Sequence, residues 1–145
     1  MRVERFAGSP DELAAAFTQL VPQLSKSNPP PLVDDVKAML ASDAITQFVA
    51  RDDDDRIIGV STLAVFRVPT GSRAWIEDVI TDEAARGQGV GAALTLAMID
   101  RARELGCVTV DLTSRPSREA ANRLYTRLGF ERRETNVYRF GLGGG

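Results

Sequence analysis

A glycine-rich loop between a strand and a helix constrains this chain more than any other feature of its sequence. The loop reads Arg86-Gly87-Gln88-Gly89-Val90-Gly91 and follows the strand-like run from Ala74 to Thr81. Apolar residues at helical spacing come after it and end at Gly106, a typical helix C-terminal glycine. Apolar residues then alternate from Val108 to Leu112. This order predicts a strand-helix-strand crossover with two neighbouring parallel strands.

The rest of the chain predicts antiparallel strands and further helices. Ser9-Pro10-Asp11-Glu12 is typical of a helix start, because it combines an N-cap, a first-turn proline and a capping-box glutamate. We expect strands at 2–7, 45–51, 56–68 and 130–140, and helices at 10–25, 33–41 and 117–129, with Ser117 as the cap of the last one. The predicted fold class is α/β, with a mixed, mostly antiparallel central sheet. We expect one domain over residues 1–145, with a mobile glycine-rich tail at 141–145.

Composition excludes several kinds of function. The chain has one cysteine and no histidine, so we expect no metal site, no histidine-based triad and no intramolecular disulfide. Cys107 is expected in the core. No apolar run approaches the roughly 20 residues that span a bilayer, and the N-terminus lacks a signal-peptide pattern. We therefore expect a cytoplasmic protein without a membrane partner. A net charge of −2 argues against nucleic acid as a partner, although arginines recur late in the chain.

The glycine loop is suited to binding phosphate. Backbone N–H groups at a helix start lack partners, and the helix dipole favours an anion there. Glycines let an oxyanion approach these amides and adopt positive φ. No Gly-Lys-Ser/Thr follows as in a P-loop, and the spacing does not fit the dinucleotide fingerprint G-x-G-x-x-G. The structural alternative is a tight turn that only needs glycine.

Two motifs resemble the GNAT acyltransferase superfamily. Arg86, Gly89 and Gly91 match its Arg/Gln-x-x-Gly-x-Gly/Ala pattern, in which the loop amides hold the pyrophosphate of acetyl-CoA. The segment from Asn122 through Tyr125 to Gly129-Phe130 matches a second family pattern. The resemblance covers residues 45–140, whereas the first 44 residues match only in the order of their elements. It implies acetyl-CoA as co-substrate.

The resemblance also implies which residues contact acetyl-CoA. In that family, the strand corresponding to 74–81 separates from its parallel neighbour and turns backbone groups toward the pantetheine. The implied contacts are Val79, Ile80, Thr81, Arg86, Gly87, Gln88, Gly89, Val90, Gly91, Ala92, Asn122 and Tyr125.

Acyl transfer to an amine needs an uncharged nucleophile and a proton for the departing thiolate. The resemblance implies Tyr125 as the acid; the alternative is a core tyrosine, because the apolar stripe of its helix includes it. Glu77 and Asp78 are adjacent in a strand, so they should face opposite sides of the sheet. We expect Glu77 to act as the base, beside Trp75, Val79 and Thr81. Asp78, between two isoleucines, would then need a buried partner.

The predicted function is therefore N-acetylation of a small-molecule or peptide amine, by direct attack in a ternary complex. Amino-sugar phosphate acetylation is an alternative, because residues 75–79 and 136–140 look similar to that branch. The stretch 112–116 lacks the carboxylate found there. A non-catalytic acyl-CoA-binding module is a second alternative. We also expect a homodimer formed through a last strand, Glu131 to Phe140, since relatives often dimerise through that region.

Overall fold

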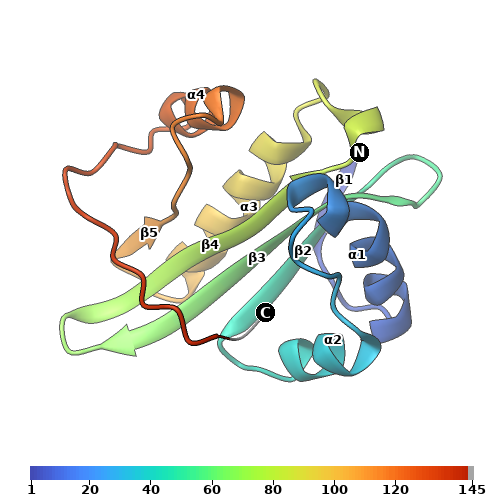
Figure 1. Ribbon diagram of the computed structural model, residues 1–145, viewed down its shortest axis with the longest axis horizontal. Coiled ribbons are helices and arrows are strands. Elements are labelled where there is room, and N and C mark those ends of the chain that lie inside the picture. The colour runs from blue at the N-terminus through green and yellow to red at the C-terminus, as the bar shows by residue number, and fades with distance from the viewer. Residues whose placement is uncertain (144–145) are drawn as a thin grey trace. The chain divides into compact units, whose positions relative to one another are not determined.

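The computed structural model describes residues 1–143 and divides the chain into two compact units, Met1–Leu112 and Thr113–Gly145 (Figure 1). A single domain over the whole chain stays a prediction. The predicted mobile tail lies partly outside the described residues, at 144–145.

The first unit is built on a five-stranded sheet in the order β1-β2-β3-β4-β5. Its strands are β1 (Arg2–Arg5), β2 (Ile45–Arg51), β3 (Ile57–Val68), β4 (Gly71–Thr81) and β5 (Thr109–Asp111). The first four pair antiparallel, and β4 and β5 pair parallel. The mixed, mostly antiparallel sheet predicted from the sequence is confirmed.

Helices cover both faces of this sheet (Figure 1). On one face, α1 (Pro10–Leu24) packs on β4 and α2 (Val33–Leu40) packs on β2. The core there consists of Leu13, Ala14, Phe17, Leu20, Val36, Val49, Val60 and Ile80. On the other face, α3 (Val90–Glu104) approaches β3 closely, since a Cβ at Gly59 would lie 2.6 Å from Val90 Cγ1. Between residues 1 and 143, the structure has no helix with the length and hydropathy to cross a membrane.

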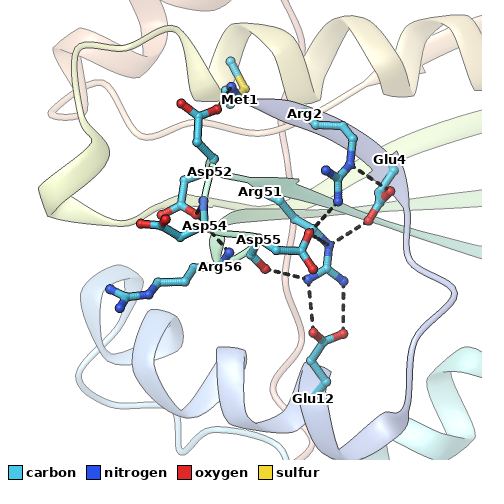
Figure 2. Close-up of polar contacts among 10 residues, drawn as sticks. Met1, Arg2, Glu4, Glu12, Arg51, Asp52, Asp54, Asp55 and Arg56 are labelled. Carbon is cyan, nitrogen blue, oxygen red and sulfur yellow. Dashed lines mark hydrogen bonds and ion pairs between the residues drawn. The ribbon is translucent and has the colours of Figure 1, made fainter.

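A buried arginine ties the N-terminal elements together (Figure 2). The side chain of Arg51, at the end of β2, is only 8% exposed. Its Nε donates to Glu4 of β1 at 2.7 Å, and its two terminal nitrogens donate to the two carboxylate oxygens of Glu12 in α1, both at 3.0 Å. A further bond reaches the carbonyl of Asp55. Glu12 thus bonds Arg51, while Ser9 caps α1 by accepting from the Glu12 amide.

The second unit contains one helix, α4 (Glu119–Arg127). The prediction that Ser117 caps it is wrong, because Arg118 is the N-cap residue and no side chain caps the turn. Asn122 Nδ2 donates to the carbonyls of Arg115 and Arg118, both at 2.8 Å, and so fixes the approach to the helix.

The predicted strand from Phe130 to Phe140 is also wrong. The structure has no strand in this segment, and residues 131–143 are exposed. A strand requires a partner edge for its backbone groups. The described part of the second unit offers no other strand to supply one.

Candidate coenzyme and acyl-transfer site

The C-terminal half of β4 has no paired strand on its β5 side among the described residues. The parallel pairing of these strands ends at Trp75 and Asp111, whereas β4 continues to Thr81. The backbone of residues 76–81 therefore has no β5 partner on that side. The separation of the two strands that the family resemblance implied stays a prediction, because β5 itself ends at Asp111. An open edge of this length can hydrogen-bond an extended ligand in the way a strand would.

A β-bulge interrupts β4 at the same place. Val60 pairs with Ile80 and Thr62 with Glu77, so Ser61 lies opposite both Asp78 and Val79. Asp78 adopts a φ of 50°, the left-handed region that aspartate tolerates better than most residues. A bulge bends the strand and changes which way the following residues point.

The bulge corrects two expectations about the carboxylates. Asp78 is exposed, so the prediction that it needs a buried partner is wrong. Ile80, which pairs with Val60, shares the face of Glu77, whereas Val79 and Thr81, which were expected there, do not. Strict alternation assigned these faces, and the extra residue shifts the alternation by one.

Glu77 is held by a neighbouring aromatic side chain. Trp75 Nε1 donates to Glu77 Oε1 at 2.7 Å. The two residues lie two positions apart on the same face of β4, as expected. Glu77 is exposed, so its carboxylate is accessible from solvent. Trp75 was expected only to line the site, and this bond was not predicted; an indole two residues before a carboxylate in a strand is the signal for it.

A short turn leads from β4 to the glycine loop. Its 3₁₀-helix, Glu83–Ala85, is capped by Asp82, which accepts from the Ala84 amide. Gly87 and Gly89 follow with φ of 81° and 78°. An added Cβ would meet nothing within 4 Å at either glycine. Both glycines thus serve the backbone conformation and leave open space above the loop, as a phosphate cradle requires.

The first turn of α3 is available to an anion. Gly89 is its N-cap and provides no side-chain bond, and the first turn contains no acidic residue. The other helices of residues 1–143 differ, because each has an acid in its first turn: Asp11 and Glu12 in α1, Asp34 and Asp35 in α2, Glu119 in α4. An uncapped, acid-free N-terminus behind two positive-φ glycines fits a pyrophosphate.

Tyr125 and Asn122 belong to the second unit, whereas Glu77, residues 79–81 and the loop residues 86–92 lie together in the first. Tyr125 packs edge-to-face on Phe130, with ring centroids 5.7 Å apart. Burial raises the pKa of the Tyr125 phenol above its ordinary 10.0, and the charge of Arg118 opposes part of that rise. The phenol is therefore protonated at neutral pH, as an acid must be.

A mixed sheet with one parallel pair, followed by a glycine loop at a helix start that no side chain caps, defines an α/β protein whose backbone here suits a phosphate group. The chain belongs to the acetyltransferase (GNAT) family, whose family model matches residues 13–130.

Individual relatives agree with this assignment. The chain is similar to a mycothiol acetyltransferase of Renibacterium salmoninarum, with 34% identity over 68% of this chain and 30% of that protein. It is 33% identical to the glucosamine 6-phosphate N-acetyltransferase of Trypanosoma brucei brucei, over 64% of this chain and 63% of that protein. The match thus spans less than two thirds of either relative. A putative acetyltransferase from Agrobacterium tumefaciens superposes with a TM-score of 0.85 at 26% identity, over 97% of this chain and all of that one.

Proposed function

We propose that this protein is an acetyl-CoA-dependent N-acetyltransferase that modifies a primary amine of a small molecule or peptide. One observation carries the proposal. The edge of β4 that β5 leaves unpaired leads, through a single short turn, into the phosphate cradle, which is formed by the amides of residues 87–92 at the start of α3. No side chain caps this helix start. A strand edge suits the amide groups of pantetheine, and the cradle suits its pyrophosphate.

The proposed binding roles follow the geometry of each group. The amides of residues 87–92 bind the pyrophosphate oxygens, and Arg86, which is exposed, adds a positive charge beside them. The backbone of Val79, Ile80 and Thr81 bonds the pantetheine and directs the thioester toward the bulge. Asn122 completes the coenzyme contacts in this proposal.

Glu77 and Tyr125 divide the proton transfers of the proposed reaction. Glu77 accepts a proton from the acceptor amine, directly or through water, which frees the nitrogen lone pair. The nitrogen attacks the thioester carbonyl carbon, a C–N bond forms, and the C–S bond breaks. The nitrogen then releases its second proton to water, while the Tyr125 hydroxyl gives its proton to the departing thiolate, so that the products are an amide and a thiol. Water returns a proton to the Tyr125 phenolate.

The names of the relatives indicate two classes of acceptor amine. Relatives named for mycothiol and for glucosamine 6-phosphate suggest small polar amines, and N-alpha-acetyltransferase 30 of Schizosaccharomyces pombe suggests a peptide amine. A homodimer and a cytoplasmic location belong to the same proposal.

The test is thiol release from acetyl-CoA in the presence of single amines. The panel contains an amino sugar, its 6-phosphate, a cysteinyl amine and a peptide N-terminus. Amine-dependent release of thiol with one of them supports the proposal. Binding of acetyl-CoA with no release above background for any amine would instead favour a non-catalytic acyl-CoA-binding module.

A further inference from the structure

We propose that Gln19 and Gln23 of α1 are positioning residues for the coenzyme cradle. The two glutamines position the cradle by holding in place the turn between β4 and the glycine loop. This role rests on the proposed function, because it concerns the same coenzyme site.

Two hydrogen bonds link α1 to this turn across about 60 residues of sequence. Gln19 Nε2 donates to Asp82 Oδ2 at 2.9 Å, and the Glu83 amide donates to Gln23 Oε1 at 2.9 Å. The glutamines lie four residues apart and therefore share one face of the helix. Gln23 also donates to the carbonyl of Gln19, which links the two residues.

The bond from the Glu83 amide to Gln23 satisfies the last backbone N–H group of the turn. The Glu83 amide is satisfied by Gln23, the Ala84 amide by Asp82 Oδ1 at 3.2 Å, and the Ala85 amide by the Asp82 carbonyl at 2.8 Å. The turn before the loop thus has no free amide for an anion, whereas the first turn of α3 has no side-chain cap. Of these two adjacent helix starts, only α3 is left to receive the pyrophosphate.

The turn is also anchored on its sheet side. The Asp82 amide donates to the Ile58 carbonyl at 2.9 Å, and Ala85 is buried. With α1 on one side and β3 on the other, the backbone that enters Arg86 and Gly87 has a fixed direction. An exposed loop that contains positive-φ glycines needs such an anchor, because glycine loses more conformational freedom on ordering than other residues.

Four variants separate positioning from mere stability. Gln19→Met and Gln23→Met keep the length of the side chain and remove the bond to the turn. Gln19→Glu/Asp82→Asn exchanges donor and acceptor, so it restores a bond between the same two positions. Thr18→Ala is the matched control on α1, since the Thr18 hydroxyl bonds only the Ala14 carbonyl of its own helix.

Calorimetric titration with coenzyme A gives the first readout. Each Met variant should bind about threefold to tenfold more weakly, as expected for one lost hydrogen bond. The exchanged pair should recover most of the affinity, and Thr18→Ala should match wild type. If coenzyme A binds wild type and both Met variants equally, the positioning role is wrong even where the melting temperature falls.

Amide hydrogen exchange without ligand gives the second readout. The Met variants should exchange faster at residues 83–89 than wild type, while the amides of β2 remain unchanged. Unchanged exchange at 83–89 would overturn the role independently of any ligand. A wild-type chain that does not bind coenzyme A would contradict the proposed function, and the exchange data would still decide whether the glutamines hold the turn.

Discussion

The indole of Trp75 donates a 2.7 Å hydrogen bond to the carboxylate of Glu77, two residues along the same strand. The bond leaves the second carboxylate oxygen, Oε2, for the amine or water of the proposed reaction. Trp75 is also the only tryptophan of the chain. Its indole N–H resonance therefore reports on this contact without interference.

Glu77→Gln should retain the fold and lose activity. The amide oxygen of glutamine still accepts from Trp75, but the variant cannot take a proton from the amine. We expect kcat to fall roughly 10²-fold or more, with little change in coenzyme affinity. The neighbouring Asp78→Asn is the control, because Asp78 is exposed and asparagine tolerates its positive φ. A large loss in Asp78→Asn with none in Glu77→Gln would reverse the roles of the two carboxylates.

Tyr125→Phe should slow acyl transfer while it preserves the helix. The substitution removes one hydroxyl and keeps the ring that packs on Phe130. If the phenol protonates the thiolate, kcat should fall roughly 10²-fold, and coenzyme affinity should change little. A core tyrosine would instead cost about 1 kcal/mol of stability. An unchanged kcat with both substrates saturating would remove Tyr125 from the mechanism.

Arg51 should be essential for stability. Its guanidinium is buried and makes charge-assisted bonds to Glu4 and Glu12, so Arg51→Met should lower the free energy of unfolding by about 2–4 kcal/mol. Arg2→Met is the control, because Arg2 is exposed and exposed ion pairs contribute about 0–1 kcal/mol. Urea denaturation of both variants measures the difference. Equal losses would contradict the central place of Arg51 in this network.

The same network predicts a loss of stability in acid. Hydrogen bonding from Arg51 lowers the pKa of Glu4 below its ordinary 4.5, and hydrogen bonding from Arg2 lowers the pKa of Asp55 below 3.8. Carboxyls with lowered folded-state pKa values stabilise the fold above their ordinary values. That contribution disappears as the pH falls through the lowered values. The difference in unfolding free energy between wild type and Arg51→Met should therefore shrink below about pH 4. A constant difference down to about pH 2 would refute this.

The C-terminal segment should mediate self-association. Val137, Tyr138 and Phe140 are 71%, 88% and 87% exposed in the chain by itself. Light scattering should give the mass of a dimer, and Val137→Asp/Tyr138→Asp should shift it to a monomer. A monomeric wild-type protein at working concentrations would contradict the homodimer.

Sequence patterns predicted local features well. The cap and the apolar stripe of α1 and the position of the glycine loop each depend on neighbouring residues, so the sequence encodes them directly. The bulge at Asp78 was not predicted, because alternation carries no mark of one extra residue. The strand at 130–140 was wrong because its residues favour β-structure but strand formation depends on a partner edge. The bonds of Gln19 and Gln23 link segments about 60 residues apart, and no local pattern indicates them.

The assignment of the coenzyme site is tested most directly by comparing how two variants, Gly89→Val and Gly106→Val, bind coenzyme A. Both glycines adopt positive φ, 78° and 72°, and an added Cβ would meet nothing within 4 Å at either one, so both substitutions carry the same kind of backbone strain. Only Gly89 lies in the cradle. By calorimetric titration, Gly106→Val should bind coenzyme A like wild type and Gly89→Val should show no detectable binding. Normal binding by folded Gly89→Val would contradict the assignment of the coenzyme site.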